Sequence, residues 1–158
     1  MTDPTTPADT SEFLRLDRRR LLAAFDRGAL TAVGVSLVYG LLIYPVGLTW
    51  GLIAVAVAGG WLIGKGILRG AWAGGVAQPS RILQALAAAL GVLAWLGAFA
   101  IAYIVAELLL VSDRSLLDRL SIIGYWDYIA GTYDLFHAAS LGAIAIAGWW
   151  STRWTPAR

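Results

Sequence analysis

The chain has 158 residues, of which 59% are hydrophobic and only 14% are charged. Soluble domains carry about 25% charged residues, so this composition excludes an ordinary soluble domain and indicates a membrane protein. The chain has no cysteine and a single histidine, His137, which argues against disulfides, iron–sulfur clusters and multi-histidine metal sites, so we expect no metal and no cofactor. The net charge of +2 is not gathered in one patch, and we therefore expect no nucleic-acid partner.

Residues 1–27 form an Arg-rich segment that is expected to lie in the cytoplasm and to be partly disordered. Residues 12–27 place several leucines along one side of a predicted helical lead-in. The basic side chains expected at lipid headgroups, here and further along the chain, are Arg18, Arg19, Arg20, Lys65 and Arg69. Each basic residue gains about 1 kcal/mol near an anionic leaflet. A simple positive-inside anchor explains the same charges, and we favour that interpretation.

Four apolar stretches follow and predict an all-α fold, with a single four-helix transmembrane domain over residues 28–154. The predicted spans are Gly28–Tyr44, Leu48–Leu68, Ile82–Leu110 and Leu135–Thr152. Each approaches or exceeds the about 20 residues that a helix needs to cross about 30 Å of hydrocarbon. Because these spans use most of the chain, we expect no second folded domain.

The positions of Lys and Arg predict the side of the membrane that each connection occupies. Ten of the 12 precede the first span, surround the connection between the second and third spans, or follow the fourth: Arg15, Arg18, Arg19, Arg20, Arg27, Lys65, Arg69, Arg81, Arg153 and Arg158. The other two, Arg114 and Arg119, share the 111–134 loop with four aspartates. Short loops rich in Lys and Arg stay in the cytoplasm, so both termini are expected inside.

Small residues recur at four-residue spacing along three predicted spans, which places them on one face of each helix. The set comprises Gly60, Gly64, Ala94, Ala98, Ala102, Ala106, Ala139, Ala143 and Ala147. In lipid, helices attract one another largely where small residues let the backbones approach closely. We expect these faces to pack the four helices together, and contact with another subunit is the alternative.

The 111–134 loop predicts a short interfacial helix over about Ser115–Ile123, before the fourth span. Ser115 and Asp118 resemble an N-terminal capping box, and apolar residues then recur at helical spacing. The aromatic residues that follow are expected at headgroup level: Tyr125, Trp126, Tyr128 and Tyr133. We interpret the loop as an interfacial anchor, and a docking surface for a partner is the alternative.

Ionisable side chains near the ends of the spans are the only candidates for chemistry. Glu107 and His137 lie near the outer ends of the third and fourth predicted spans, and Asp134 precedes His137 by three residues. A carboxylate and a histidine that face one another at this depth form a ligand or proton-exchange site. The simpler interpretation, which we favour, is that Glu107 reaches the interface and His137 lies beside Asp134 at a helix cap. No catalytic residue is expected.

The end of the second predicted span reads G-G-W-L-I-G-K-G-I-L-R-G from Gly59 to Gly70. It resembles a G-x-L-I-G-K motif of uncharacterised bacterial four-helix integral membrane proteins. Trp61 stands where that family has tyrosine, and Gly66 stands where it has alanine. The resemblance extends in layout over about residues 28–154 and implies a bacterial origin and this fold, but no activity.

The sequence favours a non-catalytic accessory or scaffold protein that packs against other membrane subunits through its small-residue faces. Its expected location is the bacterial cytoplasmic membrane, and its expected partners are the lipid bilayer and a membrane protein or a second copy of itself. One alternative is a small oligomeric transporter or channel, in which Glu107, His137, Tyr39 and Ser36 face one another across a cavity. Another is an outer-leaflet enzyme with Glu107 or His137 as its acid–base group.

Overall fold

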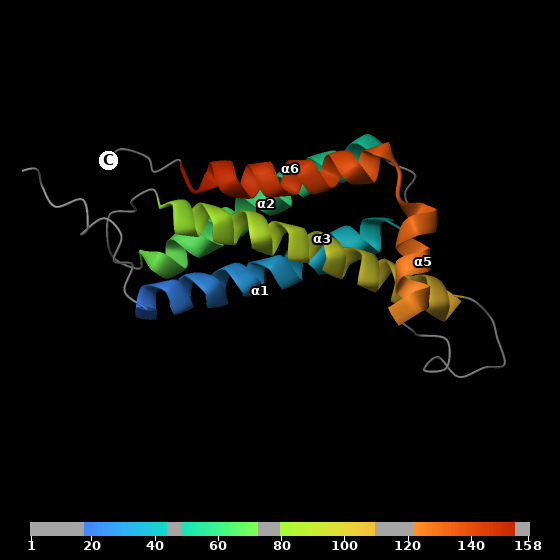
Figure 1. The fold of residues 1–158 in the computed structure, drawn as a ribbon, viewed down its shortest axis with the longest axis horizontal. Coiled ribbons are helices and arrows are strands. Elements are labelled where there is room, and N and C mark those ends of the chain that lie inside the picture. The colour runs from blue at the N-terminus through green and yellow to red at the C-terminus, as the bar shows by residue number, and fades with distance from the viewer. Residues whose placement is uncertain (1–17, 44–48, 73–79, 110–121, 154–158) are drawn as a thin grey trace, which may run out of the picture.

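The computed structural model describes residues 18–43, 49–72, 80–109 and 122–153. These residues form five helices and no strand, so the all-α prediction is confirmed for them. The helices are α1 (Arg18–Ile43), α2 (Thr49–Ala71), α3 (Arg81–Leu109), α5 (Ile122–Thr132) and α6 (Leu135–Ser151). In Figure 1, α1, α2, α3 and α6 run alternately in opposite directions, and α5 crosses the end of the bundle.

Three helices, α1, α2 and α3, are long and apolar enough to cross a membrane. The pair of α5 and α6 adds a fourth candidate only if it is taken as one broken span, because the two helices meet at a bend of 104°. Helix α6 alone has 17 residues. At a rise of about 1.5 Å per residue it is about 26 Å long, which is at the short end of the range for a spanning helix.

Helix α1 begins ten residues before the expected first span. Its first residues are arginines, leucines and alanines, which are strong helix formers, so the Arg-rich lead-in and the apolar segment form one continuous helix of 26 residues. Residues 1–17 of the segment expected to be partly disordered lie outside the described residues. The other predicted spans agree with α2, α3 and α6 to within three residues at each end.

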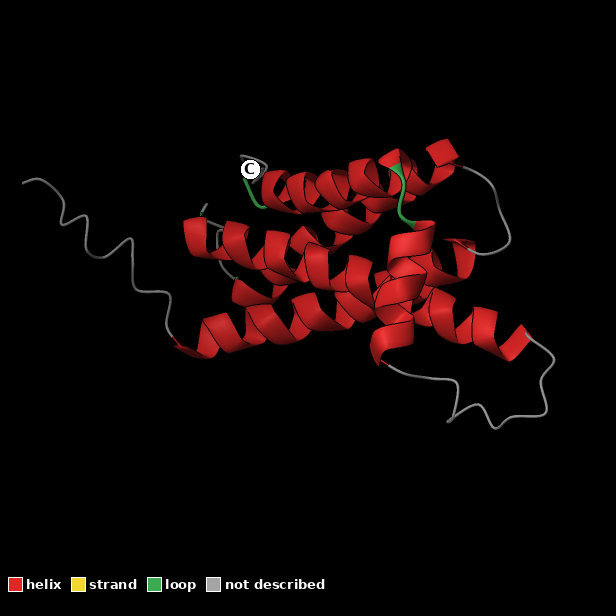
Figure 2. Cartoon of the chain, turned by 45° about the vertical axis from the view of Figure 1, so that its right-hand side comes forward, coloured by secondary structure: helices red, strands yellow, loops and turns green. Residues whose placement is uncertain are grey.

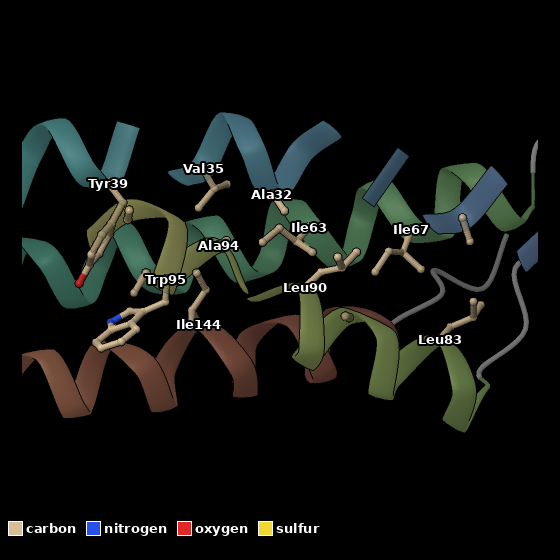
Figure 3. Packing of buried hydrophobic residues seen from close by; sticks show 14 of the residues in the cluster. Ala32, Val35, Tyr39, Ile63, Ile67, Leu83, Leu90, Ala94, Trp95 and Ile144 are labelled. Atoms are coloured by element: carbon tan, nitrogen blue, oxygen red, sulfur yellow. The ribbon is translucent and has the colours of Figure 1, made fainter. Parts of the chain in front are cut away.

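The core lies between α1, α2, α3 and α6. Helix α2 makes its most extensive contact with α6, while α1 lies across both α2 and α3. The largest fully buried hydrophobic side chains come from all four helices: Tyr39, Ile63, Ile67, Leu83, Phe99 and Ile144. Several of them interdigitate between the helices in Figure 3.

Two glycines of α2 allow α6 to approach the α2 backbone closely. A side chain at Gly60 would overlap the carbonyl oxygen of Ile144, and one at Gly64 would overlap the hydroxyl of Ser151. A Cβ at Gly64 would also lie 2.8 Å from the carbonyl oxygen of Gly148. Close approach of this kind at small residues replaces the hydrophobic driving force that is missing between helices in lipid. These two glycines therefore serve packing within the chain.

The alanines of the predicted faces differ in their burial. Ala94, Ala98 and Ala102 are buried in α3, and Ala106 is half-buried. In α6, Ala143 and Ala147 are half-buried and Ala139 is exposed. The buried line of α6 is instead His137, Ser140, Ile144, Gly148 and Ser151. These buried residues follow the alanines by one position. The buried face is therefore rotated by about 100° around the helix axis from the face that the alanines share.

Helix α5 lies across the C-terminal part of α3, as Figure 2 also shows. The Tyr125 hydroxyl donates a hydrogen bond to the carbonyl oxygen of Leu96 (2.9 Å). The Tyr103 ring faces the rings of Tyr125 and Tyr128 at centroid distances of 6.3 and 5.6 Å. Most of the interfacial helix expected over Ser115–Ile123 lies outside the described residues. The described helix is formed by the aromatic segment that follows it.

Candidate functional site

The bundle separates basic from acidic side chains between its two ends. Among the described residues, every Lys and Arg lies in the half where α1 begins and α6 ends: Arg18, Arg19, Arg20, Arg27, Lys65, Arg69, Arg81 and Arg153. At the other end lie Glu107, Asp127 and Asp134, and of the described acidic residues only Asp26 lies in the basic half. Because antiparallel helices bring alternate loops together, charges far apart in the sequence gather at one end.

Tryptophan rings accompany the cations in the basic half. The Arg20 guanidinium lies 5.3 Å from the Trp72 ring centre, and the Lys65 ammonium lies 4.9 Å from that of Trp61. At the end of α6, Arg153 approaches the rings of both Trp149 and Trp150. Paired aromatic and cationic side chains are typical of the zone where hydrocarbon meets headgroups. The residues expected at headgroups, Arg18, Arg19, Arg20, Lys65 and Arg69, all belong to this half.

A buried polar cluster connects α1, α3 and α6 toward the acidic end. The Tyr39 hydroxyl donates to the Ser140 hydroxyl oxygen (2.7 Å), and the Trp95 indole N–H donates to the same oxygen (3.1 Å). Ser140 in turn donates to the carbonyl oxygen of His137 (2.8 Å). In Figure 3 the Tyr39 hydroxyl and the Trp95 nitrogen lie on facing sides of the two rings. The one hydroxyl of Ser140 thus satisfies two buried donors from two other helices.

His137 lies one turn before Ser140, on the first turn of α6. It is 8% exposed, and its ring meets the Phe99 ring edge-to-face at a centroid distance of 5.1 Å. Asp134 caps the helix: one carboxylate oxygen accepts the backbone N–H of His137 (2.9 Å) and lies 2.7 Å from Nδ1 of its ring. The predicted closeness of His137 and Asp134 at a helix cap is therefore seen in the structure.

The cap also sets the charge of Asp134. The backbone N–H of His137 and then its side chain stabilise the ionised carboxylate, so the pKa of Asp134 lies below its ordinary value of 3.8. The carboxylate is half-exposed, whereas the histidine ring is buried. The pair consequently extends from the surface of the bundle into its interior.

Glu107 is half-buried near the end of α3, in the part that α5 crosses. It lies eight residues beyond Phe99, the α3 residue that contacts the His137 ring. At about 1.5 Å per residue, this places Glu107 about 12 Å further along the α3 axis. His137 instead has Asp134 and Phe99 as its near neighbours.

Sequence reasoning did not single out Ser140 and Trp95, the centre of the polar cluster. The available signal was a hydroxyl in an otherwise apolar stretch, because buried hydroxyls in a membrane helix require partners. Tyr39 and Ser36 were named as cavity-lining groups, but both hydroxyls are used in packing: Ser36 donates to the carbonyl oxygens of Ala32 and Ala94. Within the described ranges, no group of three or more His, Cys, Asp or Glu side chains is arranged to hold a metal ion.

Comparison with known proteins finds no match to this chain among family models, curated proteins or solved structures.

The Asp134 cap predicts that the stability of the fold decreases at low pH. Because the pKa of this carboxyl is lowered by folding, its contribution to stability is present above about pH 3.8 and is lost as the pH falls through the lowered value. Asp134→Asn keeps a capping oxygen but removes the charge. We expect the variant to lose less stability than the wild type on acidification from pH 3.8 downward, measured by thermal unfolding in mild detergent.

The matched control is Asp127→Asn, which removes a carboxylate from the same end of the bundle without touching the cap. It should retain the wild-type loss of stability at low pH. Superimposable acid profiles for Asp134→Asn and the wild type would show that the cap does not hold the ionised carboxylate.

Proposed function

We propose that the chain is a four-span integral protein of the bacterial cytoplasmic membrane that acts as a non-catalytic accessory subunit. In this proposal α1, α2, α3 and α6 span the bilayer, and α5 lies in the outer interface. Both termini are cytoplasmic. The partner is a transmembrane helix of a larger membrane protein, bound in a groove between α1 and α2.

The span and orientation assignments are supported by the separation of charges. The described Lys and Arg side chains lie in one half of the bundle, together with tryptophans, as expected for the cytoplasmic interface. Helix α5, with exposed Ile123 and Trp126, is oriented across the bundle end and suits the interface at the opposite leaflet. In that position, α5 occupies the part of the outer interface that the short helix α6 does not reach.

A groove between α1 and α2 is the single observation that carries the accessory role. It has a volume of about 450 Å³ and an almost wholly apolar lining: Thr31, Gly34, Val35, Val38, Val55, Ala58, Gly59 and Leu62. Gly34 is exposed in this groove, and a Cβ built on it meets nothing within 4 Å. A second helix can therefore approach the α1 backbone here, which is the geometry that small residues provide for helix association in lipid.

The α1–α3 groove is a weaker candidate for a partner helix. Its volume of about 430 Å³ is similar and its lining also includes small residues, but it carries larger side chains, among them Phe25, Leu37 and Leu93. Larger side chains keep an approaching helix further from the backbone than the exposed Gly34 of the α1–α2 groove does. The two glycines Gly60 and Gly64 are already covered by α6 and leave no surface for a partner.

Filling the groove tests this proposal. Gly34→Leu adds a side chain where the fold has open space, so the bundle should form normally while a partner helix is excluded. The full chain with an affinity tag is purified from its native membrane in mild detergent, and stoichiometry is read by native mass spectrometry. We expect the wild type to retain a heteromeric membrane partner and Gly34→Leu to lose about nine-tenths of it, a tenfold change that corresponds to about 1.4 kcal/mol.

Gly142→Leu is the matched control, because a Cβ at Gly142 on α6 also meets nothing within 4 Å and lies outside the groove. It should keep the partner. Loss of the partner in both variants, or in neither, would contradict docking at the α1–α2 groove. A homo-oligomer without any other subunit would contradict the accessory role and favour the oligomeric transporter.

A further inference from the structure

One atom of the polar cluster lacks a hydrogen-bond partner. Nε2 of His137 is buried, and no described donor or acceptor reaches it. The same ring is firmly held, because Nδ1 lies 2.7 Å from the Asp134 carboxylate and the Phe99 ring contacts its face or edge. Buried polar atoms are nearly always paired, so an orphan atom on a fixed ring indicates a missing ligand group.

The contact between Nδ1 and the Asp134 carboxylate determines whether Nε2 is a hydrogen-bond donor or an acceptor. A carboxylate only accepts hydrogen bonds, so Nδ1 carries the proton and donates it to Asp134. In the neutral ring Nε2 is then an acceptor with an open lone pair. The complementary group is a hydrogen-bond donor, and a positively charged donor binds most strongly.

The surroundings of His137 favour a cation. The Phe99 and Trp95 rings pack against each other at a centroid distance of 4.4 Å, and the Tyr133 ring stands edge-on to Trp95 at 6.1 Å. Aromatic faces attract ammonium groups. This end of the bundle carries Asp127 and Asp134 and, among the described residues, no Lys or Arg.

We propose that His137 is the recognition residue of a site for a primary ammonium group at the α5–α6 end of the bundle, with Nε2 accepting an N–H of that group. The ammonium belongs either to an ethanolamine phospholipid headgroup or to a soluble amine. The site is separate from the α1–α2 groove, so this inference does not depend on the accessory role.

Helix α5 is joined directly to the helix that carries this site. Nε2 has no exposed surface in the present arrangement, while α5 is joined to α6 by only two non-helical residues, Tyr133 and Asp134. Helix α5 also has the sparsest contact with the rest of the bundle among the packed helix pairs. Because Nε2 is buried, an ammonium group reaches it only after a local displacement of its surroundings.

The chain contains a single histidine, which makes a direct test possible. The full chain is labelled with ¹⁵N-histidine and placed in bilayer discs of phosphatidylcholine, whose quaternary ammonium has no N–H. Nitrogen NMR then reports Nδ1 and Nε2 of His137 alone. We expect a protonated Nδ1 and an unprotonated Nε2, and a saturable shift of the Nε2 signal when phosphatidylethanolamine replaces part of the phosphatidylcholine or when ethanolamine is added.

The two additions distinguish the source of the ammonium group. If the Nε2 signal shifts at a lower concentration of the ethanolamine lipid than of free ethanolamine, the ligand is a lipid headgroup. If free ethanolamine acts at the lower concentration, the ligand is a soluble amine. Added choline, which has no N–H on its cationic nitrogen, should leave the Nε2 signal unchanged. A proton on Nε2 in the starting state, an equal shift with choline, or no shift with either amine would overturn the proposal.

A second variant keeps the histidine probe in place. Phe99→Leu removes an aromatic face next to His137 while preserving an apolar side chain, and should weaken ethanolamine binding about threefold through the lost cation–π attraction. Trp126→Leu, an exposed aromatic of α5 outside the cluster, is the control and should bind like the wild type. Unchanged binding in Phe99→Leu would exclude an ammonium beside His137.

Discussion

Replacing Gly64 by leucine should be one of the most destabilising single changes in the bundle. The new Cβ would overlap the Ser151 hydroxyl and lie 2.8 Å from the Gly148 carbonyl oxygen, and neither obstacle is the flexible end of a long side chain. Helices α2 and α6 would have to separate, which uncovers the surface they bury against each other. We expect a loss of about 3 kcal/mol or more in the free energy of unfolding, at or above the usual range for overpacked cores, measured by denaturant unfolding in mild detergent.

Two comparisons make this result specific to the α2–α6 contact. Gly60→Leu should be damaging for the same reason, since a Cβ there overlaps the Ile144 carbonyl oxygen. Gly142→Leu adds the same side chain to α6 in open space and should be close to neutral. If Gly64→Leu were as stable as Gly142→Leu, α2 and α6 would not pack through their small residues.

Ser140→Ala should be the most destabilising change within the polar cluster. It removes an oxygen that accepts from both Tyr39 and Trp95, and these donors are 1% and 4% exposed. Each buried donor left without a partner costs about 1–3 kcal/mol. We expect the free energy of unfolding to fall by about 2 kcal/mol or more, although the substitution removes only one hydroxyl group. The measurement is unfolding in the same detergent.

A double-mutant cycle separates this network from simple packing. Tyr39→Phe leaves one lone pair of Ser140 unused but creates no orphan donor, so by itself it should cost about 1 kcal/mol. In Tyr39→Phe with Ser140→Ala, one of the two orphan donors has been removed, and the combined loss should be smaller than the sum of the two separate losses. Additive losses would mean that Tyr39 and Ser140 do not interact.

The sequence predicted the helices well because their formation in this chain is decided locally. A backbone in an apolar medium must satisfy its N–H and C=O groups within the segment, so a long apolar run becomes a helix whatever its neighbours are. The starts of α2, α3 and α6 follow from this rule. The grouping of Arg18, Lys65 and Arg153 in one half follows as well, since each reversal of direction returns the chain to the same end.

The candidate site was less predictable because it depends on contacts between distant residues. The Asp134 cap on His137 is a local interaction over three residues, and it was expected. Tyr39 and Ser140 are 101 positions apart, and only the packing of α1 and α6 against α3 brings their hydroxyls together. No spacing in the sequence indicates such a pair.

The composition, the lengths of the apolar runs and the distribution of Lys and Arg were therefore enough to determine an all-helical chain with candidate membrane spans and one basic end. The tertiary structure alone decided which face of α6 is buried, and it selected Ser140, Ile144 and Gly148 over the alanines one position away. Both faces of α6 carry small side chains, so the conformational energy of the isolated helix favours neither face for burial. In the folded chain Gly60 and Gly64 of α2 lie against Ile144, Gly148 and Ser151 of the buried face. The 104° bend between α5 and α6 and the burial of His137 are likewise seen only in the tertiary structure.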